Sequence, residues 1–246
     1  TATITLNRPE KRNALSDKLV HELSWAFQQA EKDGHAKVIC LKATGKAFCA
    51  GADLAYLQKL QDFSEEENLS DSQQLKALFQ QIYQCPKPVV AQVQGSALAG
   101  GCGLVSVCDF VFSVPEARFG YTEVRIGFVP ALVATFLLRK LGGTVARELL
   151  LSGQLLSAEE ARKKGLVHRV IQADALERET RSFIQELITS NSATAMQVTK
   201  ETILALENMP LEEGLDFAAQ QNAKARQTED CKRGISAFLN KAKLSW

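Results

Sequence analysis

The chain has 246 residues, 46% of them hydrophobic and 23% charged, which is enough to bury a large core in one or two domains. Its 29 Lys and Arg residues nearly balance 28 Asp and Glu, so no strong field favours nucleic acid or an anionic membrane as a partner. No apolar run reaches the roughly 18 residues that span a bilayer, and no signal-peptide pattern opens the chain. We therefore expect a soluble cytoplasmic protein.

Short runs rich in β-branched residues alternate with amphipathic stretches through the first two thirds of the chain. The amphipathic stretch over residues 16–33 has Ser16 as a potential N-cap and Gly34 after its last turn, which predicts a well-bounded helix. Such alternation is typical of a layered α/β fold. The runs are TATITL (1–6), VICLKA (38–43), PVVAQVQG (88–95), GCGLVSVC (101–108) and FVFSV (110–114).

Two polar segments interrupt this alternation. Residues 63–71 (FSEEENLSD) are acidic and lie between helical patterns, so we expect an exposed, mobile loop that could act as a lid. Further along, Ser157 and Glu160 are the two ends of a potential capping box, and Gly165 closes the short helix that follows. The next residues, LVHRVI, are typical of a strand.

The pattern becomes wholly helical from Asp174 onward. We therefore divide the chain into a core over residues 1–172 and an α-helical region over residues 173–246, packed together without a flexible linker. The six cysteines contain no C-x-x-C pair, and most lie in apolar surroundings. We expect them to be reduced core thiols.

Three segments depart from what a core alone would require. They are FCAGADL (48–54), VQGSALAGGCGL (93–104) and FGYTEVRIGFVP (119–130). Turns of Ala and Gly let a ligand approach the backbone, and N–H groups that begin a helix are free to donate, so the first two segments could form an oxyanion hole. Taken alone, their glycines would favour the simpler role of tight helix–strand packing. The segments match neither the phosphate-binding glycine templates nor the G-x-S-x-G elbow.

Together these segments resemble the crotonase superfamily, also called the enoyl-CoA hydratase/isomerase family, from about Ile4 to Phe238. The look is closest to bacterial short-chain or methylglutaconyl-type enoyl-CoA hydratases. The resemblance implies an α/β fold built as a spiral of ββα units. It also implies a C-terminal α-helical region that assembles the protein into homotrimers or dimers of trimers. The matching pieces are NRPEKRNAL, FCAGADL, QGSALAGGCGL, CDFVFSVPEARFGYTEVRIGFVP and LLLSGQLLSAEEARKKGLVHRV.

The same resemblance assigns roles to single residues. The backbone N–H groups of Ala52 and Gly100 look like the donors that hold the thioester oxygen of an acyl-CoA, and Glu123 looks like the catalytic acid and base. Without its flanking residues, Glu123 would be taken for a surface glutamate in a loop. No metal and no separate cofactor are implied, because coenzyme A arrives as part of the substrate. The residues expected to contact CoA are Arg12, Ala14, Ala50, Asp53 and Leu54.

The implied chemistry passes through a thioester enolate. Losing one preorganised donor to such an oxyanion typically costs about 2.7–4 kcal/mol, so two donors could supply much of the barrier reduction. Family hydratases usually carry a second glutamate where this chain has Gly103, and a single carboxylate suits a Δ3–Δ2 double-bond isomerisation. The overall resemblance favours hydration of a short or branched 2-enoyl-CoA, which we place first, with isomerisation second. A catalytically weak paralogue that binds acyl-CoA or a partner is the third alternative.

Other positions carry weaker signals. Arg125 could meet an acidic acyl tail, but a structural ion pair is the favoured role. Ala131 stands where dienoyl-CoA isomerases and hydroxyacyl-CoA hydrolases carry an aspartate, which argues against both activities. Candidates for contacts to the CoA phosphates, each more often a solvated surface charge, are Lys11, Arg12, Lys241 and Lys243.

Overall fold

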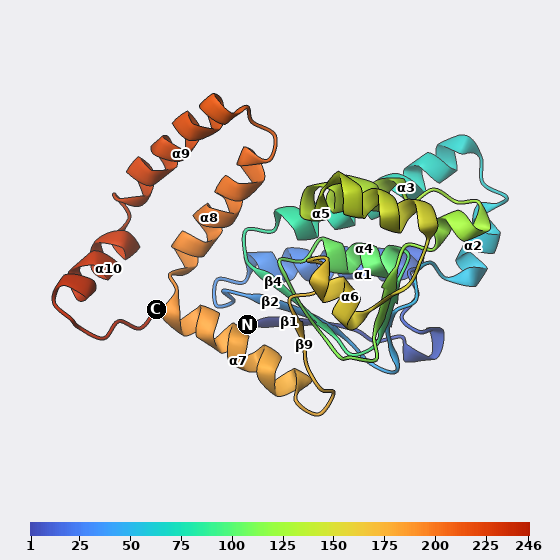
Figure 1. The fold of residues 1–246 in the computed structure, drawn as a ribbon, viewed down its shortest axis with the longest axis horizontal. Coiled ribbons are helices and arrows are strands. Elements are labelled where there is room, and N and C mark those ends of the chain that lie inside the picture. The colour runs from blue at the N-terminus through green and yellow to red at the C-terminus, as the bar shows by residue number, and fades with distance from the viewer.

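The strands of the protein form two sheets, as the computed structural model of residues 1–246 shows (Figure 1). The larger sheet has five parallel strands in the order β1-β2-β4-β6-β9. The smaller has four strands in the order β3-β5-β7-β8, with only the last pair antiparallel. The strands are β1 (Ala2–Leu6), β2 (Ile39–Ala43), β3 (Ala47–Cys49), β4 (Val89–Val93), β5 (Ser96–Leu98), β6 (Phe110–Ser113), β7 (Arg118–Gly120), β8 (Leu156–Ser157) and β9 (Arg169–Val170).

From β2 to β7, successive strands alternate between the two sheets. The pairs β2–β3, β4–β5 and β6–β7 each place one strand in each sheet, and each pair is followed by a helix before the next pair begins. This arrangement confirms the predicted α/β spiral of ββα units. The helices of this part are η1 (Pro9–Lys11), α1 (Asp17–Lys32), α2 (Leu54–Leu60), α3 (Glu65–Gln84), α4 (Gly100–Ser106), η2 (Glu123–Ile126), α5 (Ala131–Ser152) and α6 (Ala158–Lys163).

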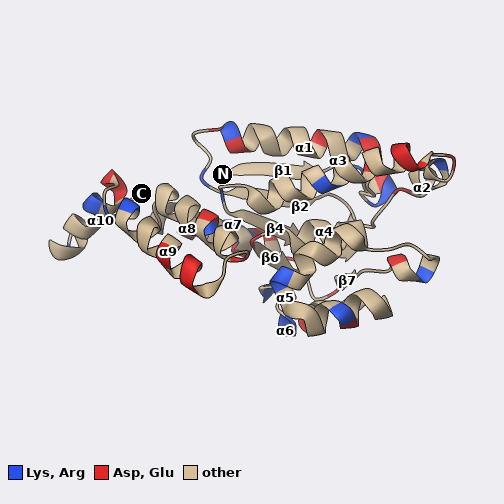
Figure 2. Cartoon of the chain, turned by 90° about the horizontal axis from the view of Figure 1, so that it is seen from above, with Lys and Arg blue, Asp and Glu red and all other residues tan.

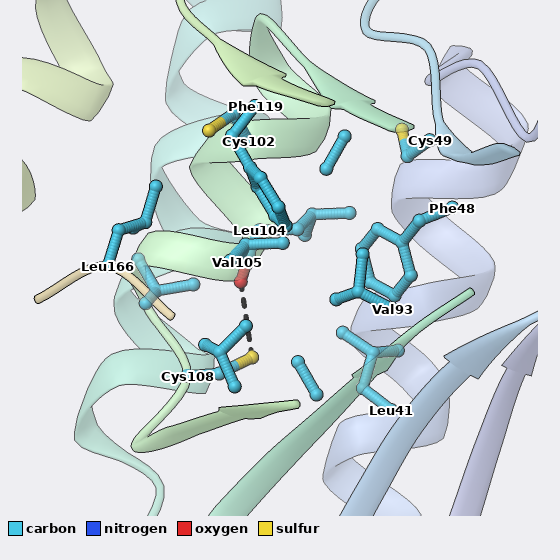
Figure 3. Close-up of a cluster of buried hydrophobic side chains, with 14 of the residues drawn as sticks. Leu41, Phe48, Cys49, Val93, Cys102, Leu104, Val105, Cys108, Phe119 and Leu166 are labelled. Atoms are coloured by element: carbon cyan, nitrogen blue, oxygen red, sulfur yellow. Dashed lines mark hydrogen bonds between the residues drawn. The ribbon is translucent and has the colours of Figure 1, made fainter. Parts of the chain in front are cut away.

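Helix α4 runs through the core, where Figure 3 shows its side chains against those of the neighbouring strands. Every residue of α4 after Gly100 is buried, and Cys108 donates its thiol proton to the carbonyl of Leu104 at 3.2 Å. The run GCGLVSVC, expected among the β-branched segments, is therefore helical for most of its length. A helix buried on all sides has no polar face, so its sequence lacks the amphipathic period that identifies surface helices.

The acidic segment over residues 63–71 is also different from its prediction. Most of it forms the first turns of α3, so the loop expected there is wrong. Ser64 accepts a hydrogen bond from the N–H of Glu67, while the Glu67 carboxylate accepts one from the N–H of Ser64. This capping box satisfies helix-start donors, and three acidic residues suit the positive end of the helix dipole. The predicted caps Ser16 and Ser157 are both confirmed.

After β9 the chain contains only helices. Figure 1 shows α8, α9 and α10 extending away from the sheets, at the opposite end of the molecule from α2. Lys200 of α8 is buried and forms an ion pair of 2.6 Å with Asp109, which ties this arm to the end of the core. None of the helices combines the length and apolar surface that a membrane crossing requires. The last helices are α7 (Leu176–Ser190), α8 (Ala193–Leu206), α9 (Leu211–Ala225) and α10 (Glu229–Leu239).

The surface carries charges of both signs, as Figure 2 shows for the helices visible from above. Basic and acidic residues both occur in α1 and in α6, and each helix contains an ion pair of its own, Lys18–Glu22 in α1 and Arg162–Glu159 in α6. The six cysteines are free, and all but Cys231 are buried. Burial raises the pKa of Cys49 to about 12, so its thiol keeps its proton at neutral pH.

Candidate active site

Three turns of the chain meet at one edge of the smaller sheet. They follow β3, β5 and β7, which are adjacent and parallel, so their carboxyl ends lie at the same edge. Leu98 pairs with Gly120 in register, and the N–H of Ala99 donates to the carbonyl of Gly120 at 2.7 Å. The three segments singled out in the sequence are thereby brought together.

The first turn presents the N–H of Ala52. Leu15 donates its N–H to Gly51 at 2.7 Å and accepts the N–H of Asp53 at 2.8 Å, which makes a parallel bridge between Leu15 and Ala52. In such a bridge the N–H of the central residue points away from its partner. The Ala52 N–H therefore points to the side of its segment on which β3 pairs with β5. No acceptor within the chain takes this N–H.

The second turn presents the N–H of Gly100. This residue begins α4, so its N–H has no acceptor within the helix, and none is supplied from elsewhere in the chain. Ala99 just before it has φ of 49° and ψ of −125°, a strained conformation for a residue with a side chain. A Cβ at Gly101 would lie 2.3 Å from the carbonyl oxygen of Cys49, so close packing fixes the start of α4 against β3.

The third turn carries Glu123, the first residue of η2. Only 9% of this residue is exposed, and its Oε2 is buried without a hydrogen-bond partner. Burial raises the pKa of the carboxyl above its ordinary value, against a smaller opposing effect of the residue's own N–H. Glu123 is therefore not the exposed surface glutamate that its loop position alone would suggest. A partly desolvated carboxylate with a raised pKa is suited to exchange protons near neutral pH.

The five residues predicted to contact CoA lie in two segments that are hydrogen-bonded to each other beside Ala52. The N–H of Ala50 donates to the carbonyl of Arg12 at 3.1 Å. Arg12 is exposed and Leu54 is 82% exposed, whereas Ala14 is buried. The Asp53 carboxylate is buried and already engaged, since Oδ1 accepts the N–H groups that begin α2 and Oδ2 faces Arg8. Their contacts with CoA stay a prediction.

The position of the missing second glutamate is filled by apolar side chains. A Cβ at Gly103 would lie 2.6 Å from Cγ1 of Val133 and 2.9 Å from Cζ of Phe79. Both neighbours are buried, in α5 and α3 respectively. A carboxylate therefore cannot be added at Gly103 without moving this wall. Asp53 of the first turn is ion-paired with Arg8, so Glu123 is the carboxylate of the three turns that has no charged partner.

Of two weaker expectations from the sequence, the one for Arg125 is wrong and the one for the C-terminal lysines is untested. Arg125 forms no ion pair; its side chain lies instead over Gly153, whose Cβ would be 3.3 Å from Nε. Lys241 and Lys243 follow α10, and their contact with the CoA phosphates stays a prediction. Helical periodicity says nothing about where a terminal helix is placed.

Sequence reasoning missed what holds these turns in place. Asn13, which lies between the predicted CoA contacts Arg12 and Ala14, is fully buried and donates to the carbonyls of Thr44 and Ala47 at 2.8 and 2.9 Å. Its Oδ1 accepts the N–H of Arg8 at 2.8 Å. Asn13 is thus a structural link, and the φ of 53° that it adopts is a conformation that Asn tolerates better than most residues. The NRP and RNAL motifs contain both residues but give no sign of the contact.

Comparison with known proteins can now be added to this geometry. The family model described as enoyl-CoA hydratase/isomerase matches residues 1–246. A putative enoyl-CoA hydratase of Thermus thermophilus is 45% identical over 240 residues, which are 98% of this chain and 94% of that protein. The chain belongs to the enoyl-CoA hydratase/isomerase family.

Other members of the family are similar in sequence and in structure. A short-chain-enoyl-CoA hydratase of Clostridium acetobutylicum is 31% identical over 249 residues, covering 99% of this chain and 92% of that protein. The crystal structure of a putative enoyl-CoA hydratase/isomerase (crotonase) from Legionella pneumophila superposes with a TM-score of 0.90 at 35% identity, over 98% of this chain and 93% of that one. AtuE of Pseudomonas aeruginosa superposes with a TM-score of 0.93 at 33% identity, over 98% and 93%. The predicted family and fold are confirmed, while the roles of single residues stay predictions.

Proposed function

We propose that this member of the enoyl-CoA hydratase/isomerase family adds water to a short or branched 2-enoyl-CoA thioester. One observation carries the proposal: a buried carboxylate with an unpartnered oxygen, Glu123, stands at the same sheet edge as two unpaired N–H groups. The relatives named as enoyl-CoA hydratases support this reaction over others of the family. The N–H groups of Ala52 and Gly100 would hold the thioester oxygen, and Glu123 would move the protons.

The reaction balances with a single carboxylate. The Glu123 carboxylate takes a proton from water as the water oxygen bonds to the β-carbon. The electrons of the double bond move toward the thioester, whose oxygen becomes negative and accepts hydrogen bonds from the two N–H groups. The protonated Glu123 then gives its proton to the α-carbon, which restores the thioester carbonyl. Burial suits Glu123 to both steps, because the raised pKa brings the carboxylic acid and carboxylate closer in free energy.

A Δ3–Δ2 isomerisation is the alternative, and the wall at Gly103 favours it. In that reaction Glu123 would take a proton from one carbon of the acyl chain and return it to another, so no water has to be held. Val133 and Phe79 occupy the space from which a second carboxylate would orient water in a two-carboxylate hydratase. Apolar side chains at this place offer no hydrogen bond that could orient a water molecule, and they keep water away from the reacting carbons.

Products from two substrates separate these reactions. Purified protein is incubated with crotonyl-CoA and, separately, with 3-hexenoyl-CoA, and the products are identified by mass spectrometry. Hydration of crotonyl-CoA adds the mass of water. Conversion of 3-hexenoyl-CoA alone, at unchanged mass, would replace the proposal by isomerisation. No turnover of either substrate, with binding of crotonyl-CoA retained, would favour the catalytically weak paralogue.

Coenzyme A is proposed to be supplied by the substrate, with no additional cofactor. We also propose a homotrimer or a dimer of trimers, supported by apolar side chains that the C-terminal helices leave exposed; light scattering of the purified protein tests it. The cytoplasmic location expected from composition also stays a prediction, which cell fractionation tests. The exposed apolar side chains of this arm include Ile203, Leu211, Leu215, Ile235, Phe238 and Leu239.

A further inference from the structure

We propose that Arg8 and Asp53 are positioning residues that orient the N–H of Ala52, and that Asp53 does not bind CoA. The inference rests on the proposed function, because it assumes that the Ala52 N–H holds the thioester oxygen. Asp53 directly follows Ala52, and Arg8 comes from the segment that precedes η1. Their ion pair therefore joins parts of the chain that are 45 positions apart.

Both oxygens of the Asp53 carboxylate face groups of this chain, Oδ1 through hydrogen bonds and Oδ2 through an ion pair that lacks hydrogen-bond geometry. Its Oδ1 accepts the N–H groups of Ala55 and Tyr56 at 2.9 and 3.3 Å, which caps α2. Its Oδ2 lies 2.8 Å from Nη2 of Arg8, and only 7% of the side chain is exposed. A buried carboxylate would also repel the phosphates of CoA. The role of Asp53 is therefore to hold the neighbouring backbone in place, and the exposed Arg12 and Leu54 are better placed to contact CoA.

Arg8 completes a clamp around the Ala52 peptide. Its Nη1 donates to the carbonyl of Ala14 at 3.4 Å, next to Leu15, whose hydrogen bonds flank Ala52 on both sides. The ion pair thus holds the start of α2 against the same segment that fixes the direction of the Ala52 N–H. Without it, α2 keeps its cap but can tilt, and the donor turns away from the thioester oxygen. Small misalignments of such donors are costly, because the oxyanion is stabilised through their direction.

The charge of Asp53 persists over the range in which the enzyme would work. Burial by itself would raise the pKa of Asp53, but the N–H groups of Tyr56 and Ala55 and the charge of Arg8 outweigh it and hold the pKa below its usual value. Tyr56 also donates its hydroxyl proton to Asp71 of α3, so the helix held by Asp53 is fastened at a second point. The pair of Arg8 and Asp53 therefore stays ionised beside the site.

The test compares Asp53→Asn with Arg8→Lys and Arg8→Gln in the full chain. Asp53→Asn keeps an oxygen for the cap and removes the charge, so we expect kcat to fall by about 10–100-fold with KM changed less than about threefold; losing a donor outright would cost about 10²–10³-fold. Arg8→Gln should have the same effect, and Arg8→Lys should restore part of kcat. Ser64→Ala, which removes the cap of the neighbouring α3, is the matched control and should lower Tm without changing kcat.

Three results would overturn the inference. A raised KM and weakened CoA binding at unchanged kcat would make Asp53 a CoA ligand. A lower Tm with kcat and KM both unchanged would leave the pair with only a structural role. An unchanged carbonyl stretching frequency of bound butyryl-CoA, measured by isotope-edited infrared spectroscopy in Asp53→Asn and wild type, would show that the donor has not moved.

The spectroscopic readout also separates this inference from the proposed function. It needs no turnover, so it holds for hydration and isomerisation alike. Wild-type protein that neither binds butyryl-CoA nor turns over either enoyl-CoA would contradict the proposed function. Wild-type protein that does both, with variants that match it, would contradict the positioning role alone. If Asp53→Asn does not fold, the two Arg8 variants carry the same comparison.

Discussion

The two turns that present the N–H donors are held in different ways. The turn at Ala52 is fixed by polar contacts: the bridge to Leu15, the cap of α2 and the ion pair between Arg8 and Asp53. The turn at Gly100 is fixed by shape, since Gly101 lies against the backbone of Cys49. One side of the proposed oxyanion hole is thus built from charge and hydrogen bonds, and the other from the absence of side chains.

This difference predicts what each turn tolerates. Polar contacts depend on the identity and ionisation of their partners, so the Ala52 turn should respond to charge substitutions and to acid. Close packing depends on volume, so the Gly100 turn should respond to added methyl groups and ignore charge. Substitutions of each kind can therefore be used to break one turn and leave the other intact.

The largest effect is expected from removing the proton carrier while both turns stay intact. Glu123→Gln should lower kcat by about 10²–10⁴-fold, because general acid–base transfer contributes that much and an amide cannot supply it. Binding of butyryl-CoA should stay within about threefold of wild type, since neither N–H donor is touched. Stopped-flow or coupled assays measure the first quantity and calorimetry the second. Activity near the wild-type level would remove Glu123 from the mechanism.

A methyl group at Gly101 should break the packed turn. Gly101→Ala places its Cβ 2.3 Å from the Cys49 carbonyl oxygen, and because this contact is to backbone it can be relieved only by separating α4 from β3. We expect a loss of about 1–3 kcal/mol in the free energy of unfolding and a fall in kcat from the displaced Gly100 N–H.

The control for this substitution is Gly143→Ala in α5. A Cβ there would meet nothing within 4 Å, so the variant should keep full activity and be as stable as wild type or slightly more so. Urea denaturation and kcat of both variants make the comparison. Equal behaviour of the two would mean that close packing does not hold this turn.

The effect expected of a methyl group at Gly103 is a loss of stability that a second substitution partly reverses. Gly103→Ala should cost about 1–3 kcal/mol of stability, because its Cβ would overlap Val133 and Phe79. Combined with Val133→Ala, which opens a cavity at the same place, it should cost less than the sum of the single variants by about 1 kcal/mol. Strict additivity in urea denaturation would contradict this contact. The Val133→Ala single variant is also the background in which Gly103→Glu can be tried, since Glu does not fit beside Val133.

The smallest effects expected are changes of stability with pH. They should have opposite signs for Glu123 and Asp53. Burial raises the pKa of Glu123 in the folded protein above its pKa in the unfolded chain. Wild type therefore loses stability as the pH rises from the unfolded-state pKa through the folded-state pKa, and Glu123→Gln avoids that loss. Its Tm advantage should be absent in acid and grow toward neutral pH.

The pKa of Asp53 is lower in the folded protein than in the unfolded chain. Asp53 therefore stabilises the fold at pH values above its unfolded-state pKa, and this contribution is lost as the pH falls through the folded-state pKa. Asp53→Asn should therefore be less stable than wild type at neutral pH and approach it in acid. Thermal melts from pH 3 to 8 test both. Parallel curves for wild type and either variant would contradict the assigned shift.

Local patterns in the sequence were sufficient for much of the fold. The β-branched runs at VICLKA and PVVAQVQG are buried parallel strands, and the caps Ser16 and Ser157 begin helices as predicted. The same kind of signal was overlooked at Ser64, where a capping box begins α3 in a segment too acidic to suggest order. It was absent at α4, because a helix surrounded by protein needs no polar face.

The sequence alone also determined the family, through motifs in which small residues and one glutamate recur at fixed spacing. Only the tertiary structure decided that Glu123 is buried, that Val133 and Phe79 fill the space beside Gly103, and that Arg8 reaches Asp53. Each of these is a contact between segments tens of residues apart, and burial is a property of everything packed around a group. Periodicity and capping act within a few residues of the chain, so they determine the elements, whereas the surroundings of each functional group are set when those elements pack.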